Sequence, residues 1–443
     1  MKKSLFALAA IGAVAGTAQA QSSVTVYGLV DLGYVGTNTT AANPGTGATY
    51  ANGTTGVTKT NASAFADGAE STSRLGFKGN EDLGGGLSAF FTYEMQITPN
   101  QGQVISSNTG TQDRQAFAGL KKAGVGQFAF GTQYTTIFDA AGATDPGMLN
   151  NMMGNVIYDK ATAAAPSYGS NSQNFQFDGM GNNSSFTVRG SNMLKVQSDT
   201  FSGFQANAFY SMNNNNTNSA SNANGTGYSS VAGTTAGGTT NHTAWGLGVN
   251  YTWQKLLVTA NYQNFTDKAA YSLKSDGSYA TNAPAQNGWS GTSLTGTNAK
   301  DNQQYYAATY DFGILNAYVQ YINRKTMDVN FSTNYIARTG QQIGVRSFIT
   351  PTIESWASVG TGKLTVSTAS AGTNSFVNGN SSIGSNSANF GAFQLGTNYW
   401  LSKRTNLYAI YGQERTSNQN YTLNANPTSY NSNSYALGLR HTF

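Results

Sequence analysis

Apolar and polar residues alternate along most of this chain, in segments of about ten residues. In the clearest segment, 243–253, large apolar side chains occupy every second position: Trp245, Leu247, Val249 and Tyr251. Glycine and asparagine occupy the positions between them. Such a segment presents one apolar face and one polar face, as does a strand in the wall of a membrane barrel. A soluble sandwich strand can show the same alternation, so the repetition along the chain carries the argument.

The pattern predicts sixteen strands. In the first half they are 24–36, 72–80, 87–97, 113–121, 126–134, 187–198, 203–212 and 242–253. In the second half they are 256–265, 302–311, 314–324, 340–349, 353–360, 389–400, 405–414 and 434–443.

Short and long connections alternate between these strands. The short ones have two to six residues, and the long ones, such as 37–71 and 266–301, are rich in Asn, Ser, Thr and Gly. Tight turns at one end and long loops at the other are typical of an outer-membrane barrel with both termini on the turn side. The alternative, disordered linkers between adhesin modules, does not explain why the long segments recur on one side of a regular series of strands.

The first twenty residues are predicted to be a secretory signal. Lys2 and Lys3 precede a short apolar run, and Ala18-Gln19-Ala20 provides the small residues of a cleavage site. The mature chain, 21–443, then forms one barrel domain. It has 22 basic and 19 acidic residues, a net charge of +3 that is too small to indicate nucleic-acid binding.

Composition narrows the class further. Charged residues are only 10% of the chain and aromatic residues 12%, which is unusual for a soluble domain. No cysteine is present, so the sequence offers neither disulfides nor thiolate metal ligands. After the signal, no apolar run approaches the length of a membrane-spanning helix, so a chain that crosses a membrane does so with closed strands.

The last nine residues also alternate and end on an aromatic ring. Tyr435, Leu437, Leu439 and Phe443 share one face. A soluble terminus is usually polar and frayed, whereas this one fits a closing strand whose last ring lies in the membrane interface. It also looks like the assembly signal of outer-membrane proteins, so we expect the barrel-assembly machinery to be a partner.

Several strings resemble the trimeric general porins of β-proteobacteria. They include the opening 22–28, the stretch 73–87 with Ser73-Arg-Leu-Gly-Phe-Lys-Gly, the segment 114–120, the string 401–405 and the terminal 438–443. They run from the first strand to the last. The resemblance implies a passive, weakly anion-preferring, homotrimeric pore for ions and small hydrophilic solutes in the outer membrane, in contact with its lipid and lipopolysaccharide. One departure is Gly131-Thr132-Gln133, where the family commonly has an arginine at the middle position.

The connection 135–186 is the longest, and the resemblance implies that it folds into the pore. We expect its acids to form one side of a constriction: Asp139, Asp145 and Asp159, with Asp178 as a fourth candidate. By alternation, Arg74, Arg114 and Arg189 face the pore and form the basic side, with Phe117 on the outer face. Opposed charges of this kind set ion preference at a narrow point. The alternative is that each arginine only pairs with a carboxylate such as Glu94.

Further charged side chains are predicted to face the lumen: Glu94, Lys78, Lys195, Arg346 and Arg440. Lys78 and Arg440 are expected near the turn side, where the pore is wide.

No catalytic or metal site is predicted. Only His242 and His441 are available as imidazole bases, and a pairing of His242 with a loop serine carries no specific signal. We therefore expect no enzyme activity, cofactor or metal. Two other channel or surface roles stay open: a substrate-specific channel with an aromatic slide or a fixed row of ligands, and an adhesive barrel that acts through its loops.

Overall fold

The computed structural model describes residues 23–43, 56–101, 113–159, 185–217, 238–269, 297–329, 335–368, 384–416 and 430–443. The predicted signal, Asp178 and most of the predicted external loops lie outside these residues. The described part of the chain has one α-helix, α2 (Thr136–Thr144), and no helix that is long and apolar enough to cross a membrane.

Seventeen strands make up one antiparallel sheet. The first nine are β1 (Ser23–Asn43), β2 (Gly56–Asp67), β3 (Arg74–Gly84), β4 (Leu87–Gln96), β5 (Asp113–Lys122), β6 (Gly126–Tyr134), β7 (Arg189–Ser198), β8 (Phe204–Thr217) and β9 (Gly238–Trp253). The others are β10 (Leu256–Ala269), β11 (Thr297–Asp311), β12 (Asn316–Asp328), β13 (Tyr335–Thr350), β14 (Ile353–Thr368), β15 (Gly384–Ser402), β16 (Thr405–Thr416) and β17 (Tyr430–Thr442).

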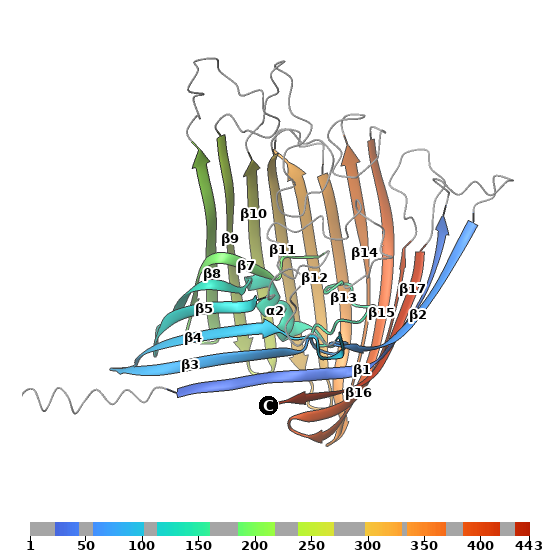
Figure 1. Ribbon diagram of the computed structural model, residues 1–443, viewed down its shortest axis with the longest axis horizontal. Helices are drawn as coiled ribbons and strands as arrows, with labels where there is room; N and C mark the ends of the chain where they lie inside the picture. Colours follow the sequence, from blue (N-terminus) through green and yellow to red (C-terminus); the bar gives the residue numbers. More distant parts are fainter. Residues whose placement is uncertain are drawn as a thin grey trace, which may run out of the picture.

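The sheet closes on itself through its first and last strands. β1 pairs with β17 along one edge and with β3 along the other, so β1 and β3 to β17 form a closed ring of sixteen strands. Figure 1 shows the C-terminus beside β1 and β16. The predicted sixteen-stranded antiparallel barrel is confirmed.

The seventeenth strand, β2, corrects the prediction that 37–71 is a loop. β2 pairs with residues 32–43 of β1, at the loop end of the barrel, and β3 pairs with residues 23–29, at the turn end. β2 and β3 together therefore form one interrupted strand. The interruption is held by Asp31, which is fully buried and accepts hydrogen bonds from the backbone N–H groups of Glu70 (2.9 Å) and Ser71 (2.6 Å). The Tyr408 hydroxyl donates a third, at 2.6 Å.

The turn ends of the strands match the prediction within four residues. The loop-side ends of β1 and of β8 to β17 extend further than predicted, whereas those of β3 to β7 do not. β9, for example, begins at Gly238 and β14 ends at Thr368. These extensions consist mainly of Asn, Ser, Thr and Gly. Both faces of a strand beyond the membrane meet water, so the period of two that marks the membrane wall is absent there.

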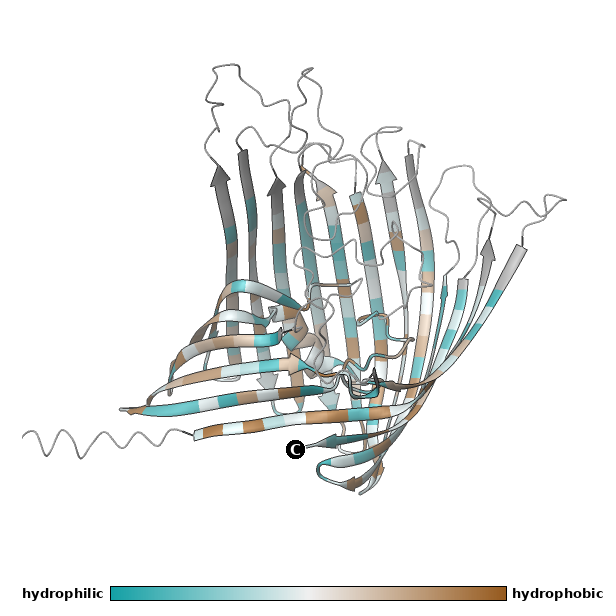
Figure 2. Cartoon of the chain, viewed as in Figure 1, coloured by the Kyte–Doolittle hydropathy of each residue, from teal (hydrophilic) through white to brown (hydrophobic). Residues whose placement is uncertain are grey.

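The outer face of the ring is apolar. On β9, Trp245, Leu247 and Val249 are exposed by 41%, 55% and 46%, and the residues between them face inward. On β17, Leu437, Leu439 and Phe443 are exposed in the same way. Figure 2 shows hydrophobic and hydrophilic residues alternating along the strands. In a soluble protein such exposure is unfavourable, but in a membrane it places the apolar side chains against lipid.

This arrangement predicts different costs for a new charge on the two faces. Leu247→Arg places a guanidinium against lipid and is expected to lower the free energy of unfolding by about 2–4 kcal/mol. Asn250→Arg, on the same strand but facing the lumen, is expected to cost less than about 1 kcal/mol. Guanidinium unfolding of the two folded variants in lipid vesicles measures the difference. Equal losses would contradict the assignment of faces.

Candidate functional site

The described part of the third connection lies inside the ring of strands. It leaves β6 at Tyr134 and forms α2, whose N-cap Thr135 accepts a hydrogen bond from the N–H of Phe138 at 3.3 Å. The buried face of α2 packs on the opposite wall, with Ile137 in one cluster with Tyr305 and Ile322. Figure 1 shows α2 between the curved β3 to β7 and the upright β9 to β15. The segment therefore crosses the lumen.

Five buried glutamines on the inner wall hold this segment in place. This glutamine row consists of Gln263, Gln303, Gln320, Gln342 and Gln394. Its side chains bond both to one another and to the loop, because an amide both donates and accepts. Gln342 Oε1, for example, accepts from the N–H of Val156 at 2.9 Å, and Gln303 Oε1 accepts from the N–H of Thr187 at 2.8 Å.

At the far end of the row, Gln394 exchanges two hydrogen bonds with Asn150, at 2.6 and 3.0 Å. Its Nε2 also donates to the carbonyl of Met153 at 2.9 Å. Asn151 beyond it donates to the carbonyl of Gly68 at 2.7 Å, in the interruption between β2 and β3. The loop is thus tied to the wall from β11 to the start of the barrel.

Wall glycines let the loop lie directly on the strands. A Cβ on Gly412 would collide with the carbonyl oxygen of Met153, and one on Gly360 would stand 2.7 Å from the side chain of Val156. A Cβ on Gly344 would stand 2.5 Å from Pro146. Real Cβ atoms do not approach so closely, so these three positions form a shallow track in which the loop lies.

The wall on the other side of the lumen is basic. Arg74 and Arg114 both contact Glu94, with N···O distances of 3.7 and 2.7 Å. Arg114 also donates to the Tyr134 hydroxyl at 3.0 Å, and the guanidinium of Arg189 stands 5.5 Å from the centre of the Tyr134 ring. The Nε of Arg189 has no hydrogen-bond partner among the described residues. One carboxylate thus faces three guanidinium groups.

Arg114 reaches this cluster through a bulge, and the bulge corrects our assignment of Phe117. Glu94 pairs with Gln115 while Met95 pairs with Asp113, so Arg114 is an extra residue on β5. The bulge shifts the alternation by one position. Gln115 and Phe117 consequently line the lumen, where alternation from Arg114 had predicted Phe117 on the outer face.

The predicted acids do not form a row that faces the arginines. Asp139 pairs with Lys195, and Asp159 pairs with Arg338 at 3.2 Å. Asp145 is 3% exposed and accepts hydrogen bonds from the N–H of Leu149 and from Asn155, both at 2.8 Å. Burial raises the pKa of Asp145, and these hydrogen bonds act in the opposite direction. Asp145 therefore stabilises the fold of the loop and does not line the open lumen.

The remaining predicted residues serve several roles. The Nζ of Lys78 stands 5.4 Å from the centre of the Tyr27 ring, and Arg346 donates to Glu354 at 2.6 Å and to the carbonyl of Pro146 at 3.2 Å. Arg440, predicted near the wide turn side, pairs in register with Asp31. It thus lies close to the level of Arg74 and adds a fourth cation there.

Sequence reasoning missed two buried arginines on the loop side. Arg324 and Asp301 form a fully buried pair, with an Nη2–Oδ2 distance of 2.5 Å. Arg338 donates to the Ser185 hydroxyl at 2.7 Å and to the carbonyl of Val156 at 3.0 Å. Both have the inward parity that alternation predicts for lumenal residues, but nothing in the sequence shows that they anchor the loop.

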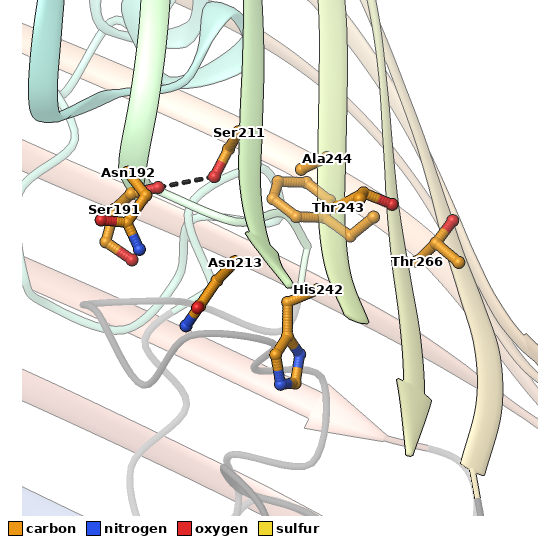
Figure 3. Close-up of a pocket in the computed structure, with 9 residues that line it drawn as sticks. Ser191, Asn192, Ser211, Asn213, His242, Thr243, Ala244 and Thr266 are labelled. Atoms are coloured by element: carbon orange, nitrogen blue, oxygen red, sulfur yellow. Dashed lines mark hydrogen bonds between the residues drawn. The ribbon is translucent and has the colours of Figure 1, made fainter. Parts of the chain in front are cut away.

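His242 lies beside a very small cavity of about 10 Å³ with Ser211 and Ser191, on the scale of a single water molecule. The Ser211 hydroxyl donates to the carbonyl of Ser191 at 2.5 Å, and in Figure 3 the His242 ring points away from that hydroxyl. His441 Nδ1 lies 2.9 Å from the Thr405 hydroxyl on the exposed outer face. The described residues therefore place no serine in position to be activated by either histidine.

Comparison with known proteins gives a consistent result. The profile of a family described as Gram-negative porin matches residues 7–419. An outer membrane porin protein of Bordetella pertussis is 32% identical over 218 residues, which is 48% of this chain and 49% of that protein. The chain therefore spans about half the length of this curated relative.

Solved structures share the fold. An anion-selective porin from Comamonas acidovorans superposes with a TM-score of 0.59 at 17% identity, over 95% of this chain and all of that one. The trimer form of OmpT from Vibrio cholerae gives a TM-score of 0.53 at 14% identity, over 95% of this chain and 99% of that one. At these identities the likeness concerns the fold alone.

The glycine track predicts a sharp effect of one methyl group. In Gly412→Ala the new Cβ meets the Met153 carbonyl, so the loop must move toward the lumen, with a loss of about 1–3 kcal/mol in unfolding free energy. We expect a lower single-channel conductance. The matched control is Gly391→Ala, whose Cβ would have its nearest neighbour at 3.7 Å. Unchanged conductance and stability in Gly412→Ala would show that the loop does not rest on this strand.

Proposed function

The chain belongs to the Gram-negative porin family, whose barrels lie in the outer membrane, and from that premise we propose that it is a general diffusion pore. Ions and small hydrophilic solutes pass through it passively. The family and the fold favour a channel over an enzyme.

One observation gives this proposal its main support. The loop that enters the lumen is fastened to the wall of β10 to β15 by the glutamine row, while the Arg74–Arg114–Arg189 wall lies on the other side. Apart from the Asp139–Lys195 pair near its start, the bonds described above hold the loop to one wall. A loop held in this way narrows the passage without closing it, as a diffusion channel requires.

We also propose a weak preference for anions. The loop acids Asp139 and Asp159 are matched by Lys195 and Arg338, and Asp145 is turned into the loop. The arginine wall, in contrast, has a single carboxylate, Glu94, for three guanidinium groups. The unbalanced positive charge at the narrow level attracts anions and repels cations. The Comamonas protein with the same fold is described as anion-selective.

The assembly proposed is a homotrimer, in keeping with the trimeric form of the similar Vibrio barrel. The apolar outer band implies contact with membrane lipid, and we propose lipopolysaccharide and the barrel-assembly machinery as further partners. In this proposal the face of Leu437, Leu439 and Phe443 on β17 acts as the assembly signal.

The test is conductance in a planar bilayer, with the reversal potential measured across a salt gradient. We expect large ohmic steps in groups of three and a reversal potential of the sign that anion preference gives. Folded protein that inserts and does not conduct would contradict the channel.

Arg189→Gln is expected to lower the anion-to-cation permeability ratio more than Arg114→Gln. The guanidinium of Arg114 is already matched by Glu94, whereas the Nε of Arg189 has no partner among the described residues. Arg404→Gln, at an exposed turn between β15 and β16, is the charge-matched control and should leave the ratio unchanged. A larger effect in the control would place the selective charge at the pore mouth instead.

A further inference from the structure

We propose that the lumen on the turn side of α2 contains a binding site for neutral, ring-shaped, polyhydroxylated solutes, the chemical class of small sugars. The inference rests on the proposed channel function and gives that channel a preferred solute. The site adjoins the arginine wall at Tyr134, but none of the three arginines lines it.

The site is a cavity of 420 Å³ bounded by strands β4 to β9 and by α2. This volume is in the range of small-molecule sites. Its wall residues lie toward the short turns: Gln127 follows the first residue of β6, and Gln205 follows the first residue of β8. A solute that passes the loop from outside would therefore meet this cavity next.

Amides dominate the lining. Seven of the fourteen lining residues are Gln or Asn, and the two charged ones, Lys195 and Asp139, pair with each other. The cavity thus offers many donors and acceptors without an unmatched charge. Such a surface suits a neutral solute with many hydroxyl groups, because an ion would find no counter-charge while each hydroxyl can both donate and accept.

One of these amides is available to a ligand. The side chain of Gln115 lines the cavity and forms no hydrogen bond within the described residues. It can therefore donate to and accept from the hydroxyl groups of a solute.

The cavity also has an apolar side. Phe90 and Phe117 lie edge to face, with ring centres 6.3 Å apart, and both line the cavity. Phenyl rings in a water-filled lumen are unfavourable unless something covers them. The C–H face of a sugar ring is a flat apolar surface, and its rim carries the hydroxyls that amides bind. The pairing of aromatic rings with amides therefore favours a cyclic polyol over a linear one.

The test is calorimetric titration of folded, detergent-solubilised protein with maltose. Separate titrations with sorbitol, a linear polyol, and with benzoate, an aromatic anion, test the two other ligand classes. We expect weak, saturable binding of maltose and no measurable binding of sorbitol. Phe117→Leu is expected to weaken maltose binding about five- to tenfold, in line with the loss of one aromatic contact. The matched control is Phe130→Leu, on the outer face of β6 with 58% of the residue exposed, which should bind like the unaltered protein.

A second variant separates the amides from the ring. Gln115→Leu removes a side chain that bonds to no described residue, so the fold should tolerate it, while maltose binding weakens again. Equal losses in Phe117→Leu and Phe130→Leu, or no maltose binding by the folded protein, would overturn the proposal. Tighter binding of benzoate than of maltose would also overturn it, because the ligand would then be an aromatic anion held at the arginines.

Failure of this proposal and failure of the channel can be told apart on one preparation. Conductance without sugar tests the channel alone, and calorimetry tests the site whether or not current flows. If both hold, maltose on either side of the bilayer should reduce the current of the unaltered protein at concentrations that leave Phe117→Leu open.

Discussion

The arrangement inside this barrel depends on how the buried polar backbone of the third loop is satisfied. A loop that enters a protein interior brings N–H and C=O groups that cost free energy when they lose water without gaining a partner. The glutamine row supplies those partners: Gln342 accepts from Val156, Gln303 accepts from Thr187, and Gln394 donates to Met153. Some of these amides also bond to a glutamine on the next strand, as Gln342 does with Gln320 at 3.0 Å. These bonds stiffen the wall where the loop rests.

The attachment of the loop to one wall also determines where positive charge stays unpaired. The cations on the loop side, Arg324 and Arg338, are occupied with Asp301 and Asp159 and contribute to structure. On the facing wall Arg74 and Arg114 share Glu94, while the guanidinium of Arg189 stands over the Tyr134 ring. The field across the lumen therefore arises mainly from the surplus on one wall, whereas the sequence had predicted opposed rows of acids and bases.

The sequence predicted the architecture well because the membrane imposes a strict period of two. Because one face of each strand meets lipid and the other meets water, every second residue is apolar, as in Trp245, Leu247 and Val249. Glycine-rich turns indicate the strand ends. The prediction was wrong where that period is absent or broken. β2 lies in a polar segment, and the bulge at Arg114 reverses the face of Phe117.

The site was predicted less well than the fold. Alternation places Arg74, Arg114 and Arg189 on the inner face, and the structure brings all three to one cluster. Alternation does not show which inward residues pair across the barrel, so the sequence did not predict the burial of Asp145 or the anchoring of the loop by Arg338. Such partners are far apart in the chain, as Asn150 and Gln394 are, and only the closed ring brings them together.

The interruption between β2 and β3 has a consequence for how such a barrel can vary. Among the described strands β2 pairs only with β1, while the register of β3 is set separately by residues 23–29 of β1 and by β4. The β2 arm of the β1–β2 hairpin is thus decoupled from the register of β3, whereas its β1 arm stays paired with β17 as far as Ala41. The length and composition of the β2 arm can therefore drift during evolution, and the surface seen by antibodies or phages can change, without shifting the strands that define the passage.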